Sequence, residues 1–324
     1  MEIGYLEPLR LAWQRTKRLL FAPFDLTRWL TIAFAAWLAG LAGGGAGGGN
    51  PGFRMGPGGR PWLPLHRPHH FPFSATPFEH GLWIPLILLA AVLVVALLIL
   101  LLWLSSRAKF VFLDDVVQGR GAVVEPWHRL APQGNSLFLW RLGFALVCLL
   151  VAGFVAALVI GLAGGPWHLG FSSPRTVAAT LFAAGALVTF GLGVAAVALI
   201  LDSFIVPIMY STGLRASEAW RQFLPWLERF AGPFLLYALF VLALWIGVAV
   251  AVVAAGLFTC CVGFIVLAIP YVGTVVLLPV FVTYRAYSLE FLAQLHPGFA
   301  VLPPLPGPPP AGAPDTYPPE PPRS

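Results

Sequence analysis

The residues with the clearest capacity for chemistry are three histidines in a segment rich in glycine and proline. His66, His69 and His70 form an H-x-x-H-H pattern, and neutral imidazoles are ligands of borderline metals such as Zn²⁺ and Cu²⁺. Segment 43–81 has 11 Gly and 7 Pro among 39 residues and only Glu79 as an acidic residue, so it offers a metal no rigid surroundings. We therefore expect solvated histidines in a flexible outer loop. A metal site on these three residues is the alternative.

Charged residues at the ends of apolar runs form the second group. Asp202 ends a run without charges that begins after Arg175, and Arg141 and Arg285 lie near the ends of other apolar runs. A pair of Asp202 with Arg141 or Arg285 would line a vestibule at the cytoplasmic face. The alternative, which we favour from sequence, is that these side chains anchor the helices at the headgroup level. No apolar run has a carboxylate or histidine near its middle, which argues against a proton-coupled pump with a buried relay.

The remaining reactive residue types do not assemble into a catalytic motif. The adjacent Asp114 and Asp115 lack evident partners for chelation or acid–base work, so we expect them in a solvated turn or a helix cap. Cys148 stands alone, and the neighbouring Cys260 and Cys261 can form only a strained vicinal disulfide. The sequence has no CxxC, GxSxG, HExxH or Walker-type motif. We predict no catalytic residue and no cofactor.

The composition indicates that these residues are positioned by membrane helices. Of 324 residues, 59% are hydrophobic and only 10% are charged, whereas soluble proteins carry roughly a quarter. There are five long apolar runs. The last, residues 233–284, would measure about 78 Å as one helix and must reverse near residues 256–263. The prediction is an all-α polytopic integral membrane helix bundle with six spans. The predicted spans are residues 26–42, 82–104, 137–162, 176–201, 233–256 and 262–284.

The distribution of Lys and Arg predicts the orientation of these spans. Of the 19 basic residues, all but Arg54, Arg60, Arg67 and Arg175 fall on one side of the predicted topology. Because basic residues are retained in the cytoplasm, we expect an inner-membrane protein with both termini in the cytoplasm and residues 1–25 as a basic interfacial segment. The net charge of +6 is then explained by topology and by contact with membrane lipids, and nucleic acid is not a needed partner.

A pattern of an acidic residue, a tryptophan and a basic residue precedes three of the spans, around Trp13, Trp127 and Trp220. It divides the chain into three units of an interfacial helix followed by a hairpin of two spans. The units are residues 1–104, 105–206 and 207–290. Internal repetition of this kind is common in membrane folds that enclose a site. The alternative is that any multi-pass protein has Trp and Arg near its cytoplasmic helix ends.

The third of these interfacial helices has the clearest amphipathic pattern. Its apolar residues recur at helical spacing, at Ala216, Ala219, Trp220, Phe223, Leu227 and Phe230. Arg215, Arg221 and Arg229 fall mostly outside that face and are the predicted contacts to lipid headgroups.

Residues 291–324 are predicted to be a disordered, Pro-rich cytoplasmic tail. Eleven of the 22 residues from 303 to 324 are proline, which favours an extended polyproline conformation. Such a tail could bind a partner protein with a groove for Pro-rich peptides. We favour a solvated tail without a fixed partner.

Residues 204–223, with the sequence FIVPIMYSTGLRASEAWRQF, combine an aromatic-Val-Pro span end, a small loop and an Ala-Trp-Arg helix start. This segment resembles one in bacterial multi-pass proteins similar to the membrane domain of glycerophosphoryl diester phosphodiesterases, and residues 108–145 carry a weaker echo. The catalytic module of those enzymes is a separate soluble barrel, for which six spans in 324 residues leave no room. The resemblance therefore implies a membrane domain without the phosphodiesterase chemistry.

Together these features favour a non-enzymatic membrane component that binds lipids or partner proteins in the organisation of the cell envelope. The alternative is a transporter or channel for a small or lipid-like solute, which the repeat and the predicted kinks at Pro270 and Pro279 would suit. A lipid-modifying enzyme is the third hypothesis, because it needs polar groups at one membrane depth and only Asp202 with arginine partners offers them.

Overall fold

The structure, a computed structural model, describes residues 4–22, 24–42, 80–163, 174–259, 262–295 and 297–303. All regular secondary structure in these residues is helical. In chain order the helices are α1 (Leu6–Phe21), α2 (Leu26–Gly40), α3 (His80–Gln118), α4 (Val124–Arg129), α5 (Ala131–Ala163), α6 (Pro174–Ile200), the π-helix η2 (Leu201–Ile205), α7 (Val206–Thr212), α8 (Ala216–Arg229), α9 (Ala231–Phe258), α10 (Val262–Ala268), α11 (Pro270–Leu295) and the 3₁₀-helix η3 (Pro297–Phe299).

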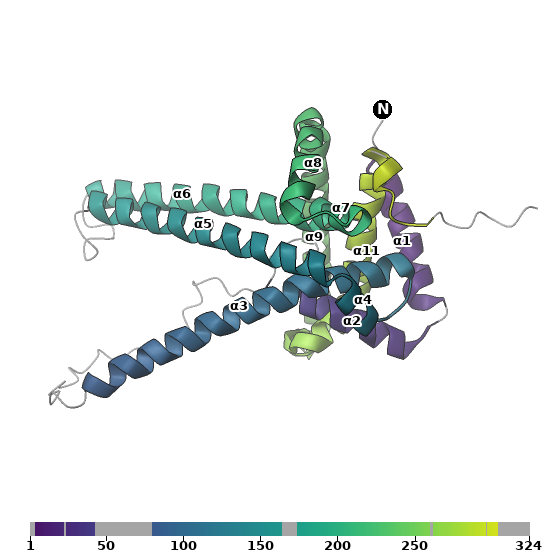
Figure 1. Cartoon of the computed structure of the whole chain (residues 1–324), viewed down its shortest axis with the longest axis horizontal. Helices are drawn as coiled ribbons and strands as arrows, with labels where there is room; N and C mark the ends of the chain where they lie inside the picture. Colours follow the sequence, from purple (N-terminus) through teal and green to yellow (C-terminus); the bar gives the residue numbers. More distant parts are fainter. Residues whose placement is uncertain are drawn as a thin grey trace, which may run out of the picture.

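The helices form a packed hub from which long apolar arms project (Figure 1). The hub consists of α1, α2, α4, α7, α8 and α11 together with the adjoining ends of α3, α5, α6 and α9. The free halves of α5 and α6 lie side by side, and α3 projects separately from the same side of the hub (Figure 1).

Among the described residues, five helical stretches are long and apolar enough to cross a membrane. They are Pro85–Gln118, Ala131–Gly161, Val177–Thr212, Ala231–Phe258 and Tyr271–Leu295. In the first four stretches, at most 6% of the residues in the most apolar 18-residue segment are buried within the protein. In the fifth, Tyr271–Leu295 of α11, 61% of the residues in that segment are buried. Because lipid tails solvate apolar side chains, the exposed arms fit a bilayer and would be unstable in water. The sequence prediction of an all-α polytopic membrane bundle is confirmed.

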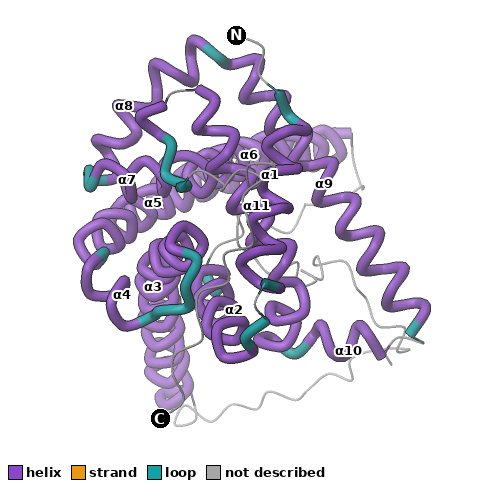
Figure 2. The backbone as a smooth tube through the Cα atoms, turned by 90° about the vertical axis from the view of Figure 1, so that its right-hand side faces the viewer, coloured by secondary structure: helices purple, strands orange, loops and turns teal. Residues whose placement is uncertain are grey.

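The centre of the hub is α11, which contacts other helices along its length. The ring of Tyr5 stacks on Phe291 at 5.9 Å between centroids, and Thr16 Oγ1 lies 3.0 Å from Thr283 Oγ1. Helix α1 therefore runs antiparallel to α11. Figure 2 shows α9 and α11 descending from the hub toward α10, which joins them at the far end. Since α1 covers α11 where it enters the hub, α11 is the least exposed of the candidate spans.

An aromatic cluster packs the junction of four helices. Phe204 of η2, Phe223 of α8, and Phe234 and Tyr237 of α9 surround Phe291 of α11. The ring centroids of contacting pairs in this cluster are 4.6 to 6.2 Å apart, the range in which aromatic pairs add to the stability from area burial. The cluster fixes α8 against the bundle and so holds its opposite, polar face toward the surroundings.

Helix α3 is much longer than the span predicted within it. Its 39 residues measure about 58 Å, roughly twice the thickness of a hydrocarbon core. The chain has no Gly or Pro from residue 86 to 118, and the helix ends where Gly119 adopts a positive φ of 65°. The predicted end of the second span at residue 104 is therefore too early: the helix continues to Gln118 in the hub, where its charged residues have partners.

Helix α2 is the predicted span that the structure does not confirm. Its 15 residues measure about 22 Å, short of the roughly 30 Å needed to cross a hydrocarbon core. Ile32 and Ala36 pack in one cluster with Val111, and Leu38 packs in another with Ala108. The two predicted spans do pair, as α2 and α3, but α2 packs against residues 104–116 of α3 and not against the predicted span 82–104.

The predicted reversal near residues 256–263 is confirmed. Helix α9 ends at Phe258 and α10 begins at Val262. A side chain on Gly256 would put its Cβ 2.4 Å from the ring of Phe264, so only glycine allows the two helices to meet this closely. The hydroxyl of Thr259 accepts the N–H of Gly263 at 3.0 Å and completes the turn. The predicted break at Pro270 is also present, because α11 begins there as a separate helix.

The end of the described chain packs more extensively than predicted. Helix α11 runs on to Leu295, and Leu292 and Phe299 are buried in the hub. The predicted boundary of the tail at residue 291 is therefore too early. The outer loop 43–79 and the Pro-rich residues 304–324 lie outside the described residues.

The approach of α5 to α3 yields a first prediction. A Cβ on Gly134 would lie 3.1 Å from Cα of Arg107, whereas Gly143 on the same helix has nothing within 4 Å. We expect Gly134→Ala to destabilise the protein by about 1–3 kcal/mol, because the backbone of α3 must move. Gly143→Ala, the matched control, should cause no loss. Unfolding of the purified full chain in mixed micelles measures both, and equal stability of the two variants would contradict the close packing of α3 and α5.

Candidate functional site

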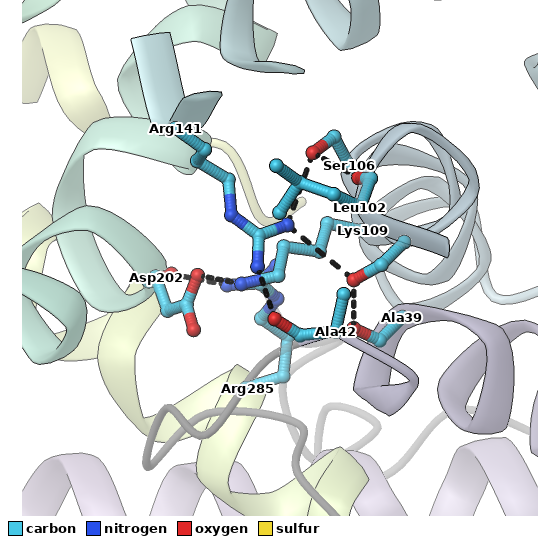
Figure 3. Close-up of polar contacts among 9 residues, drawn as sticks. Ala39, Ala42, Leu102, Ser106, Lys109, Arg141, Asp202 and Arg285 are labelled. Carbon is cyan, nitrogen blue, oxygen red and sulfur yellow. Dashed lines mark hydrogen bonds and ion pairs between the residues drawn. The ribbon is translucent and has the colours of Figure 1, made fainter. Parts of the chain in front are cut away.

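A buried polar cluster occupies the place where α2, α3, α5, η2 and α11 meet (Figure 3). It is formed by the charged residues Lys109, Arg141, Asp202 and Arg285 with the hydroxyls of Ser105 and Ser106. Nζ of Lys109 forms an ion pair with Oδ1 of Asp202, and Nη1 of Arg285 donates to the backbone oxygen of Asp202 at 2.5 Å. Asp202 is thus held from two sides, by its carboxylate and by its carbonyl.

The π-helical turn η2 positions Asp202. The N–H of Val206 donates to the oxygen of Leu201, five residues earlier, in place of the usual bond over four residues. Pro207 follows and has no N–H to give to Ser203, so the regular ladder cannot resume there. The wider turn leaves the carbonyl of Asp202 free to accept from Arg285. Single π-helical turns inside α-helices occur frequently at functional sites.

Arg141 and Ser105 cap the C-terminal end of α2, and Ser106 holds the guanidinium of Arg141. Nη2 of Arg141 donates to the oxygen of Ala42 at 2.7 Å, and Nη1 donates to Oγ of Ser106 at 3.0 Å. Oγ of Ser105 donates to the oxygen of Ala39 at 2.6 Å. The last carbonyls of a helix have no partner within it and carry its partial negative charge. The polar cluster therefore satisfies these groups, and the negative end of α2 faces the guanidinium of Arg141.

The polar cluster has an excess of positive charge. Among the described residues, Lys109, Arg141 and Arg285 are the charged groups that act on Asp202, and Asp202 is the only carboxylate that acts on each of the three cations. Lys109, Asp202 and Arg285 are 6%, 5% and 3% exposed. A lone paired carboxylate is poorly suited to proton transfer, whereas surplus buried donors suit the binding of an anion.

The sequence singled out three of these residues but not their arrangement. Arg141, Asp202 and Arg285 do come together, and Asp202 and Arg285 are buried in the hub, where they bond to other helices. Arg141 bonds to α2 and to the serines of α3. Lys109, the partner of the Asp202 carboxylate, was missed. The available signal was the uninterrupted helical pattern after residue 104, which places Ser105, Ser106 and Lys109 on one face of α3.

A second buried network surrounds Asp114 and Asp115 at the end of α3. Asp114 pairs with Arg129 and accepts a hydrogen bond from the Tyr210 hydroxyl at 2.7 Å. Asp115 accepts the N–H of Ala122 at 2.8 Å. Both aspartates are 0% exposed, so the expectation of a solvated turn is wrong. The network ties α4 and α7 to α3 and closes the loop that Gly119 begins.

Helix α8 carries the three arginines predicted to contact lipid headgroups. Its buried residues are Ala216, Ala219 and Phe223, as the amphipathic pattern predicts. Arg215, Arg221 and Arg229 are exposed. Pro225 lies within the helix, which continues to Arg229.

His66, His69 and His70 lie outside the described residues, as do Cys260 and Cys261. In the part of the chain that the structure describes, no three His, Cys, Asp or Glu side chains are grouped so that they could hold a metal ion. Cys148 is a free thiol on α5.

Comparison with known proteins gives a family without an assigned activity. The profile of a family described as a family of unknown function, DUF7544, matches residues 5–302. Neither the curated proteins nor the solved structures contain a match.

The pairing of Lys109 with Asp202 generates a second prediction. Asp202→Leu alone leaves a buried lysine without its partner and should cost about 3–5 kcal/mol of stability. The double variant Lys109→Met/Asp202→Leu should recover much of this loss, because a buried pair replaced by apolar groups is close to neutral. A double-mutant cycle on unfolding of the full chain measures the coupling. Additive effects of the two substitutions would contradict the pair.

Proposed function

The chain belongs to the DUF7544 family, whose function is unknown, and from its own geometry we propose that it is a non-enzymatic, multi-pass inner-membrane component that binds anionic lipids. In this proposal the hub lies at the cytoplasmic headgroup level and the apolar arms enter the hydrocarbon. The bias of Lys and Arg in the sequence supports this orientation, with both termini in the cytoplasm.

The observation that carries this proposal is the two-faced surface of α8. One face packs Phe223 into the aromatic cluster of the hub, and the other exposes Arg215, Arg221 and Arg229. None of these three guanidinium groups has an acidic partner among the described residues. A helix fixed on its apolar face, with arginines that have no acidic partner on the other, is suited to the phosphates of anionic lipids.

Helix α1 offers a second basic surface of the same kind. Arg10, Lys17 and Arg18 are exposed, and Nζ of Lys17 lies 5.6 Å from the ring centroid of the partly exposed Trp13. Tryptophan and a neighbouring cation are typical of the headgroup level of a bilayer. Two basic helices on one hub support binding to a charged membrane surface over binding to a single soluble ligand.

The third prediction tests this proposal on α8. In the full chain, Arg215→Glu/Arg221→Glu/Arg229→Glu should weaken binding of phosphatidylglycerol by about 100-fold, because each basic residue near an anionic surface contributes about 1 kcal/mol. Titration of phosphatidylglycerol and phosphatidylcholine in detergent, followed by native mass spectrometry, gives the two affinities.

The control for this experiment keeps the charge. The triple Arg→Lys variant at the same positions should retain the preference for phosphatidylglycerol within a few-fold, because the attraction is mainly Coulombic. An unchanged preference in the triple Glu variant would rule out α8 as the lipid-binding surface.

A second candidate function, transport of a small anionic solute, is favoured by the polar cluster. Its charged residues lie within four of the five candidate spans, and buried charges in such segments are often functional. The π-helical turn at Asp202 interrupts one of these spans. Anion flux into proteoliposomes that falls on substitution of Arg285 would support transport, and absence of flux across a panel of anions would exclude it.

A further inference from the structure

A small cavity adjoins the polar cluster on the side of α9 and α11. It has a volume of about 10 Å³, which is roughly the room that one water-sized particle needs. Its walls come from η2, α9 and α11, and they are formed by Asp202, Ser203, Tyr237, Val241, Tyr284, Arg285 and Ser288. A cavity of this size has no space for a phosphate group or a lipid headgroup.

Two hydrogen-bond donors of residues that line this cavity have no acceptor among the described residues. They are Nε of Arg285 and the hydroxyl of Tyr284, and both are buried from solvent. The hydroxyl of Ser288 donates to the oxygen of Arg285 at 2.8 Å and is already used. Buried donors without a partner cost about 1–3 kcal/mol each, more when charged, so each requires an explanation.

The polar cluster beside the cavity is also unbalanced in charge. Asp202 and Arg285 line the cavity, whereas Lys109 and Arg141 lie beyond its walls and act on the Asp202 carboxylate. Three cations thus accompany one carboxylate in the polar cluster, which leaves it with an excess of two positive charges. The negative end of α2 offsets part of the charge of Arg141, but α2 does not line the cavity.

We propose that this cavity binds a small monovalent inorganic anion of the size of chloride, held by Nε–H of Arg285 and the hydroxyl of Tyr284. A water molecule would satisfy the two donors but would leave the excess charge unchanged. A halide ion accepts from both donors and also offsets the charge, so it accounts for both the unpartnered donors and the excess positive charge. Since none of these residues lies on α8 or α1, this inference is independent of the lipid-binding proposal.

The cavity that would hold the anion is enclosed by three elements of the hub. Arg285 and Tyr284 belong to α11, Asp202 and Ser203 to η2, and Tyr237 to α9. An ion that binds only when these helices are assembled stabilises the assembled state in proportion to its concentration. Chloride is therefore expected to act as a structural ligand of the hub, whether or not the protein transports it.

The experiment is thermal unfolding of the purified full chain over a series of sodium chloride concentrations, with sodium gluconate keeping the ionic strength constant. We expect the Tm to rise with chloride and to saturate, and bromide to act in the same way. Tyr284→Phe removes one donor without changing the shape of the cavity. It should raise the chloride concentration at half-saturation by about tenfold.

The matched control is Tyr287→Phe. The hydroxyl of Tyr287 is also buried without a partner, but this residue does not line the cavity. Its loss should leave the response to chloride unchanged. Equal Tm values in chloride and gluconate, or equal shifts in the two variants, would overturn the proposal and indicate that the cavity holds water.

A direct measurement on the unmodified protein keeps the test decisive if Tyr284→Phe fails to fold. Equilibrium dialysis with radioactive chloride should give one bound ion per chain that bromide displaces and gluconate does not. Binding of no chloride would overturn the assignment.

Discussion

Burial of charge at the meeting point of five helices is the constraint on which the rest of the structure depends. A buried lysine, arginine and aspartate, with the partly buried Arg141 beside them, are unfavourable unless each is paired or hydrogen-bonded. The Lys109–Asp202 pair therefore requires α3 and η2 to remain in contact, and Arg285 ties α11 to the same residue. Arg141 adds α5 and the end of α2. Separation of any one of these helices would leave a charge or a carbonyl without its partner.

The hub and the arms have different compositions because their side chains have different surroundings. The arms present Leu, Val, Ala and Phe on nearly all faces, which is favourable in hydrocarbon, where apolar packing alone holds helices together weakly. The hub contains the polar cluster, the Asp114 network and the aromatic cluster, which are directional and specify one arrangement of the helix ends. The exposed arginines of α8 belong to a helix that the aromatic cluster holds against the hub. Binding of lipid at α8 and of an anion in the cavity would thus both involve helices of the hub.

The sequence was sufficient for the helical class, the positions of the long apolar helices, the reversal at Gly256 and the amphipathic face of α8. These features depend on local composition and periodicity. The sequence prediction was wrong where contacts between distant residues determine the structure. The charges at residues 105–118 suggest that the span ends before them, because their partners lie far away in the sequence, such as Asp202 for Lys109 and Tyr210 for Asp114. The same applies to α2, whose apolar residues suit a span or a buried hub helix equally well, and whose length of 15 residues decides between the two.

Helix α2 closes the polar cluster by packing against the buried half of α3. Disulfide trapping in the full chain, with Cys148, Cys260 and Cys261 first replaced by alanine, distinguishes this packing from pairing of α2 with the arm of α3. Ala39 and Ala108 lie in one buried cluster, whereas Ala96 is exposed on the arm of α3. The structure predicts that Ala39→Cys/Ala108→Cys forms an intrachain disulfide in membranes under mild oxidation and that Ala39→Cys/Ala96→Cys does not. Cross-linking of residue 39 to residue 96 but not to residue 108 would show that α2 pairs with the arm of α3, and would contradict its packing against the buried half of α3.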